Sequence, residues 1–176
     1  MGMTACPPWR ERRFGLWRSN LASLEQQIAQ LDQQLLDWHR ITEVSQRLAG
    51  IPGVGPVTAT ALAASVADPA MFASGREFAA FLELVPRQNS LGGRTRLGRV
   101  SKVGDRYLRT LLVTGATSVL SHLKTRTGRL DVWAKTLLDK GKPTKLVALA
   151  LASKMARIAW AIMRRGEPFR LDSAMA

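Results

Sequence analysis

Apolar residues recur at steps of four and three along residues 17–38, and this spacing constrains the fold of the 176-residue chain more than any other feature. The series, which we call the seam, consists of Trp17, Leu21, Leu24, Ile28, Leu31, Leu35 and Trp38. Such spacing places one narrow apolar stripe on a helix, as in a coiled coil. Ile41, Val44 and Leu48 continue the pattern after a slip in register, so a coiled-coil helix is predicted over 17–48. This helix either folds back on its own domain or pairs with a second chain.

The remainder of the chain also shows helical patterns, so we predict an all-α fold. Residues 1–16 lack periodicity and are expected to form an unstructured leader, and residues 166–176 a tail. Apolar stripes within residues 49–165 predict further helices near 57–66, 75–84, 104–123, 130–140 and 145–165. Three side chains are suited to cap their starts, namely Ser74, Asp105 and Thr144.

Net charge limits the classes of partner. The chain has 26 Lys and Arg against 13 Asp and Glu, a net charge of +13. This excess indicates a polyanionic partner, nucleic acid first and an anionic membrane second. The best apolar run, Leu146 to Ala152, is far shorter than the roughly 20 residues of a membrane span. A single cysteine, Cys6, excludes an internal disulfide and a multi-cysteine metal site, and we expect a cytoplasmic protein.

Much of the positive charge lies between Val85 and Arg109, a stretch that we call the basic segment. Its cations, all predicted to hold nucleic-acid phosphates, are Arg87, Arg94, Arg96, Arg99, Lys102, Arg106 and Arg109. Asp105 is its only acid, and four glycines loosen its backbone. The glycine-rich, alternating pattern of residues 87–101 is typical of a loop or an irregular β-hairpin, and both remain open.

A second candidate for phosphate binding lies upstream, where residues 48–62 resemble a helix–hairpin–helix element. Ile51-Pro-Gly-Val-Gly55 predicts a tight turn, and Pro56 suits the first position of the next helix. Gly53 and Gly55 would let the backbone approach a phosphate, and free amides at a helix start favour an anion. The alternative is a plain turn between two helices.

The side chains that could perform chemistry are hydroxyls among cations. The two histidines, His39 and His122, lie in unrelated helices and are expected to be structural, and the scattered acids form no close pair for a two-metal nuclease. A serine or tyrosine can displace a DNA 3′- or 5′-oxygen and hold the strand as a phosphoester, while arginines stabilise the transition state. Ser90 is the first candidate for this nucleophile, with Ser101 and Tyr107 as the others.

Two runs in the basic segment carry a family resemblance. Phe81-Leu-Glu-Leu-Val-Pro-Arg-Gln-Asn-Ser-Leu-Gly-Gly-Arg94 and Gly98-Arg-Val-Ser-Lys-Val-Gly-Asp-Arg-Tyr-Leu-Arg109 resemble the carboxy-terminal domain of insertion-sequence 110/116/902 family transposases. The Ile51–Pro56 element and the preceding coiled coil occur there in the same order. The resemblance implies DNA transposition, in some members guided by a structured RNA. It also carries the family serine of a Ser-x-Gly-Gly motif onto Ser90.

The family also uses an amino-terminal RNase H-like domain with four acidic residues, for which no pattern precedes the seam. The resemblance therefore predicts a truncated or split transposase, with magnesium in that other domain and no cofactor in this chain. A homodimer or tetramer would form through the coiled coil. Two alternatives stay open: a non-enzymatic DNA- or RNA-binding protein that regulates transposition, and a helical dimerisation module whose charge is incidental.

Overall fold

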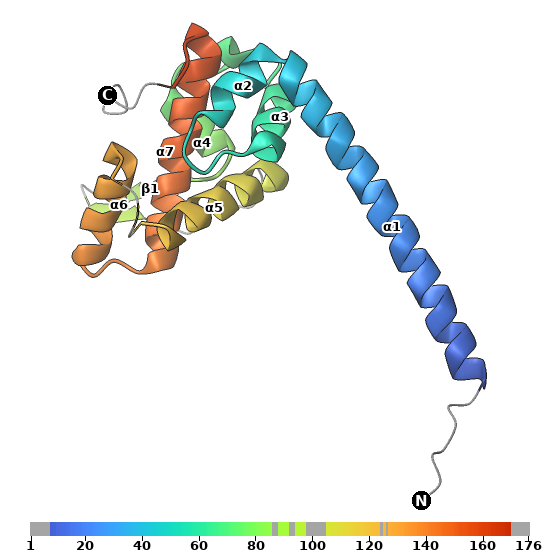
Figure 1. Ribbon diagram of the computed structural model, residues 1–176. Coiled ribbons are helices and arrows are strands. Elements are labelled where there is room, and N and C mark those ends of the chain that lie inside the picture. The colour runs from blue at the N-terminus through green and yellow to red at the C-terminus, as the bar shows by residue number, and fades with distance from the viewer. Residues whose placement is uncertain are drawn as a thin grey trace, which may run out of the picture. The chain divides into compact units, whose positions relative to one another are not determined.

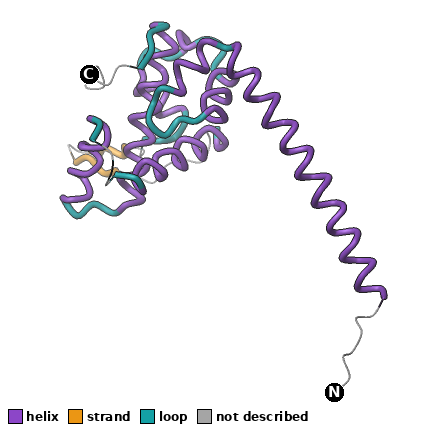
Figure 2. The backbone as a smooth tube through the Cα atoms, in the orientation of Figure 1, coloured by secondary structure: helices purple, strands orange, loops and turns teal. Residues whose placement is uncertain are grey.

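The computed structural model describes the backbone of residues 8–85, 88–91, 94–97, 105–123, 125 and 127–169. Side chains are described in these ranges except for residues 8–16 and the two strands. The chain divides into two compact units, residues 1–38 and residues 39–176. Helices dominate the described residues, with one pair of strands, drawn in orange in Figure 2. The predicted all-α class is confirmed.

The first unit contains most of α1, one continuous helix over Pro8–Ile41. Pro8 occupies the first helical position, where its missing N–H removes no hydrogen bond. The prediction of an unstructured leader is therefore wrong for residues 8–16. This stretch is rich in arginine, which has a high helix propensity, and such residues extend a helix without any apolar period.

The helix predicted over residues 17–48 is interrupted at Thr42. The backbone of Thr42 is extended, with φ −101° and ψ 104°, and α2 begins after it over Glu43–Ala49. The break coincides with the slip in the heptad pattern. Ile41 before the break is 82% exposed, whereas Leu48 after it is completely buried. The break therefore redirects the chain so that α2 contributes its apolar side to the core of the second unit.

The second unit is a set of packed helices with a small hairpin between α4 and α5. After α2 the helices are α3 (Pro56–Ser65), the 3-10 helix η1 (Pro69–Met71), α4 (Gly75–Phe81), α5 (Arg106–Ser121), α6 (Arg129–Asp139) and α7 (Thr144–Arg165). The strands are β1 (Gln88–Leu91) and β2 (Arg94–Leu97). Each helix predicted within residues 49–165 is present, and the largest difference among them is in α4, which ends three residues before the predicted Leu84.

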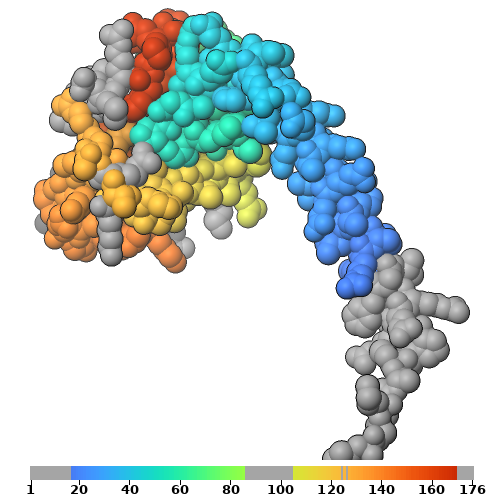
Figure 3. Space-filling view, in the orientation of Figure 1, coloured from blue at the N-terminus to red at the C-terminus, as the bar shows by residue number. Residues whose placement is uncertain are grey.

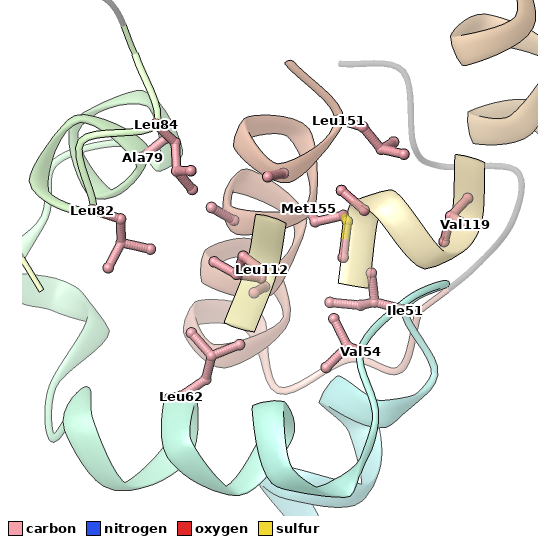
Figure 4. Packing of buried hydrophobic residues seen from close by; sticks show 14 of the residues in the cluster. Ile51, Val54, Leu62, Ala79, Leu82, Leu84, Leu112, Val119, Leu151 and Met155 are labelled. Carbon is pink, nitrogen blue, oxygen red and sulfur yellow. The ribbon is translucent and has the colours of Figure 1, made fainter. Parts of the chain in front are cut away.

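The core of this unit forms around α7, which packs against α2, η1, α4, α5 and α6 (Figure 1). Val147, Leu151 and Met155 recur every four residues on its buried side and are completely inaccessible. Figure 4 shows Met155 together with Leu112 of α5 and Ile51 of the turn after α2. Burying one such side chain stabilises a fold by about 1.5–3 kcal/mol. Packing against α7 therefore holds the other helices in place.

α7 is also long and apolar enough to cross a membrane, judged by length and composition alone. Its apolar side faces protein, with eight residues of the helix buried in the core. Gly166 ends the helix in a left-handed conformation directly after Arg164 and Arg165. The position of α7 in the core therefore accounts for its apolar composition.

The turn between α2 and α3 packs on α5 through two glycines. Gly53 has a φ of +84°, a conformation that favours glycine. A Cβ atom on Gly115 of α5 would lie 2.1 Å from the carbonyl oxygen of Gly53, and one on Gly53 would lie 2.7 Å from that of Gly115. Both obstacles are backbone atoms, which no change of rotamer can move. The turn and α5 lie on the face shown in Figure 3, with α2 and α3 in cyan to green and α5 in yellow.

Gly115→Ala tests this contact. Alanine gains about 0.5–1 kcal/mol over glycine within a helix, but overpacking against the Gly53 backbone costs about 1–3 kcal/mol and sometimes more. We expect a net loss of about 2 kcal/mol in the free energy of unfolding, measured by urea denaturation. Gly55→Ser is the matched control, because nothing lies within 4 Å of a Cβ there and serine is a good helix cap. A Gly115→Ala variant as stable as wild type would contradict the close approach.

Candidate nucleic-acid interface

The basic segment contains an antiparallel hairpin, one of the two structures that its sequence left open. The register pairs Gln88 with Leu97, Asn89 with Arg96, Ser90 with Thr95, and Leu91 with Arg94. Ser90 is therefore the third residue of β1, and its cross-strand partner is a threonine. Two short strands alone have marginal stability in water, so the hairpin depends on further packing partners.

Several predicted site residues lie wholly or partly outside the described part of the chain. Arg87, Arg99 and Lys102 are outside it, as is the alternative nucleophile Ser101. For Ser90, Arg94 and Arg96, the structure gives the backbone and register only. Their assignments to catalysis and phosphate binding remain predictions.

The end of α4 leads into the basic segment through an unusual residue, Glu83. The amides of Glu83 and Leu84 donate to the carbonyls of Ala80 and Ala79, at 2.8 and 2.9 Å, which is the Schellman pattern of a helix end. Its left-handed position is usually glycine, but here Glu83 occupies it with φ 53°. A non-glycine residue in that conformation costs of order 1–3 kcal/mol, so its surroundings must hold it there.

Arg109 of α5 holds Glu83 in that conformation. Its Nη2 donates to the carboxylate of Glu83, which is only 4% exposed, and its Nε donates to the carbonyl of Leu82 at 3.1 Å. Arg109 was predicted to bind a phosphate, but its guanidinium already serves a carboxylate and a carbonyl. The pair joins residue 83, at the end of α4, to residue 109, the fourth residue of α5. Sequence reasoning missed this contact because the partners are 26 residues apart.

The start of α5 presents another predicted cation, Arg106, to solvent. Asp105 caps the helix as predicted, since its carboxylate accepts from the amides of Tyr107 and Leu108 at 2.9 and 3.0 Å. Arg106 is exposed in the first turn, and the neighbouring Tyr107 side chain is 60% exposed. Arg106 is therefore available to an external phosphate, whereas Arg109 is committed to the fold.

The two glycines predicted to cradle a phosphate upstream have different surroundings. Gly53 is required by its positive φ and by the contact with Gly115, so packing alone explains it. Gly55 is the cap residue of α3, with open space beside it and no side chain capping the helix. Backbone amides at such a helix start can receive an anion. Phosphate binding at Gly53 and Gly55 remains a prediction.

The histidines have protein partners, as their structural interpretation expects. His39 Nδ1 lies 2.7 Å from the hydroxyl of Ser45, and His122 Nδ1 lies 2.8 Å from the carbonyl oxygen of Ser118. Among the described residues, no group of three His, Cys, Asp or Glu side chains could hold a metal ion.

Comparison with known proteins gives a family match to this region. Residues 45–130, which span α2 to the first turn of α6 and include the hairpin, match the model described as "Transposase IS116/IS110/IS902 family". The matched residues therefore contain the α2–α3 turn, the basic segment and the Glu83–Arg109 pair.

Similarity to individual proteins extends over nearly the whole chain. A Sinorhizobium fredii protein named "Putative transposase y4pF/y4sB" is 46% identical over 97% of the chain. Transposases for insertion sequence elements IS1328 of Yersinia enterocolitica and IS1111A of Coxiella burnetii are 38% and 36% identical, each over 93% of the chain. The chain spans less than half the length of these relatives, at 44%, 48% and 44% respectively.

Arg109→Met tests the role of the ion pair in stability. It leaves the buried carboxylate of Glu83 without its guanidinium, and breaking a buried pair in this way costs about 3–5 kcal/mol. We expect a loss of that size in the free energy of unfolding by urea denaturation. Glu83→Gly in the same chain should recover part of the loss, because it removes both the buried charge and the strained φ. Arg106→Met is the exposed control, and a loss no larger than that of this control would contradict the pairing.

Proposed function

Because the chain belongs to the transposase IS116/IS110/IS902 family, we propose that it binds DNA and acts in transposition as a recombinase domain. The observation that carries this proposal is the family match over residues 45–130, which contain the hairpin with Ser90. The net charge of +13 supports binding to a polyanion. Transposition also requires that DNA strands be cut and rejoined, so the proposal includes a nucleophile.

Ser90 is the proposed nucleophile. Its hydroxyl oxygen would attack a phosphorus atom of DNA, form a serine phosphoester, and release a strand oxygen that takes up a proton. The serine phosphoester conserves the energy of the broken phosphodiester bond. The hydroxyl of a second DNA strand can therefore attack the same phosphorus, release the serine and join the two strands. Arg94 and Arg96, on the strand paired with β1, would hold the phosphate oxygens, whose charge grows in the transition state.

Two exposed positions at helix starts in the second unit would hold further phosphates. Arg106 is exposed at the start of α5, and Gly55 leaves open space at the start of α3. Both helices belong to the second unit and pack against each other, so the two positions are fixed relative to one another. Arg109 has a different role in this proposal: it positions the root of the hairpin through Glu83.

The seam supports a proposal about assembly. Its residues are largely exposed on α1, with Trp17 70%, Ile28 58% and Leu31 64% accessible. An apolar stripe that repeats every three and four residues along a helix is suited to pairing with another helix of the same kind. We assign this role to a second copy of the chain. Two copies would bring two hairpins to the DNA, as recombination between two sites requires.

A non-enzymatic regulator is the second candidate function. The same positive charge and the same α2–α3 turn would support binding to DNA or RNA without strand cleavage. This candidate shares every feature of the proposal except the reactive serine. The two functions therefore differ in whether a covalent protein–DNA product forms.

Covalent trapping separates them. The chain, alone and with the remaining portion of its transposase in trans, is incubated with DNA that carries the ends of its own insertion sequence. A denaturing gel then reports protein–DNA adducts. We expect the wild-type adduct to disappear in Ser90→Ala, because the attacking oxygen is gone, and to persist in Ser101→Ala. Equal trapping by wild type and Ser90→Ala would remove Ser90 from the mechanism, and binding without any adduct would favour the regulator.

The assembly proposal has its own test in Leu24→Asp combined with Leu31→Asp. Both residues lie in the seam, so the added charges would be buried in a paired coiled coil and should dissociate it. We expect the molar mass from light scattering to fall to that of one 19.3 kDa chain. Gln26→Asp combined with Gln30→Asp is the control, since it adds the same charge on the other side of α1. An unchanged oligomer in the seam variant would exclude the seam as the interface.

A further inference from the structure

Cations gather around Trp133 where α6 packs against α7. Lys154 of α7 places its Nζ 4.6 Å from the centroid of the Trp133 ring. Arg157 follows Lys154 by three residues on α7, and Arg129 precedes Trp133 by four residues on α6. These spacings place each arginine beside its neighbour on the helix surface. We call Arg129, Lys154 and Arg157 the α6–α7 cluster.

This arrangement is unfavourable for the fold by itself. Lys154 is half-buried, and burial lowers the pKa of its ammonium, which the positive charges of Arg157 and Arg129 lower further. The buried Nε of Arg157 finds no hydrogen-bond partner among the described residues, which is a second cost. The attraction between Lys154 and the Trp133 ring offsets part of the penalty. An apolar residue in place of Lys154 would satisfy packing at lower cost.

A bound anion would offset the repulsion between these like charges. Its negative charge would favour the charged form of Lys154, and its oxygens could accept hydrogen bonds from the ammonium and from the guanidinium of Arg157. The flat face of Trp133 fixes the position of the ammonium, so less side-chain freedom is lost when the anion binds. The cluster thus has the charge, the donors and the support of a phosphate site.

We propose that the α6–α7 cluster binds a backbone phosphate of nucleic acid, as a contact additional to the basic segment. Lys154 and Arg157 lie outside residues 45–130, the part of the chain that matches the family model. That the phosphate belongs to DNA or RNA rests on the proposed function. That the α6–α7 cluster prefers a phosphate anion does not. Nucleic acid carries a negative charge at every nucleotide, so one molecule can contact the α6–α7 cluster and the basic segment at the same time.

Binding measurements on the full chain test the nucleic-acid contact. Lys154→Met and Arg157→Met, alone and combined, are compared with wild type on duplex DNA and on structured RNA over a range of salt concentrations. We expect Lys154→Met to weaken binding roughly tenfold and to reduce the slope of log K against log[salt] by about one, and the double variant by about two. Lys145→Met, which removes an exposed lysine of the same helix, is the control for loss of charge alone. If the variants lose affinity for only one of the two nucleic acids, that nucleic acid is the ligand of the α6–α7 cluster.

A thermal measurement decides the anion preference without nucleic acid. In low salt, Lys154→Met should melt at the same temperature as wild type or higher, because it removes a half-buried charge among like charges. Inorganic phosphate should then raise the melting temperature of wild type more than that of the variant. A lower melting temperature for Lys154→Met, with equal responses to phosphate, would make the lysine purely structural and overturn the site.

The two proposals fail in different ways. If wild type binds nucleic acid but the cluster variants bind equally well with unchanged salt slopes, the cluster is not a contact and the proposed function stands. If wild type binds neither DNA nor RNA, the proposed function fails, and the response to phosphate still decides whether the cluster is an anion site.

Discussion

The second unit depends on the burial of α7, because helices from every part of the unit meet on it. Its apolar residues fix α4 and α5, and α5 in turn receives the α2–α3 turn through Gly53 and Gly115. The two backbones are in close contact, so the α2–α3 turn and α5 cannot move independently of each other. The core therefore fixes both the end of α4 and the start of α5. The basic segment begins just after the end of α4 and continues into the first turn of α5.

The Glu83–Arg109 pair joins the end of α4 to the first turns of α5, the two helices between which the basic segment lies. Glu83 adopts a strained backbone conformation and its carboxylate is buried, and the guanidinium of Arg109 stabilises that carboxylate. Catalytic groups need rigid support, because small displacements from the productive geometry greatly reduce the rate. An arginine that sequence reasoning assigned to DNA is thus better explained as part of the scaffold, where it joins α5 to the end of α4.

Local patterns predicted the helices and two of their caps, Ser74 and Asp105, because periodicity and capping act over a few residues. They were wrong for residues 8–16, where a helix continues without an apolar stripe, and at Thr42, where core packing interrupts one. The pattern of residues 87–101 could not decide between loop and hairpin. Contacts of high sequence separation were not predictable at all, since no local signal links Gly53 to Gly115 or Trp133 to Lys154.

Net charge indicates a polyanionic partner but does not identify the cations that bind it. Arg109 is already neutralised by a buried carboxylate, so a phosphate would gain little from it and would have to displace Glu83. Lys154 is the opposite case, because the charges that shift its pKa are both positive. A phosphate gains most beside a cation whose pKa is lowered by burial and by neighbouring like charges. We therefore expect the nucleic-acid surface where cations repel one another in the folded protein, rather than wherever arginines are frequent in the sequence.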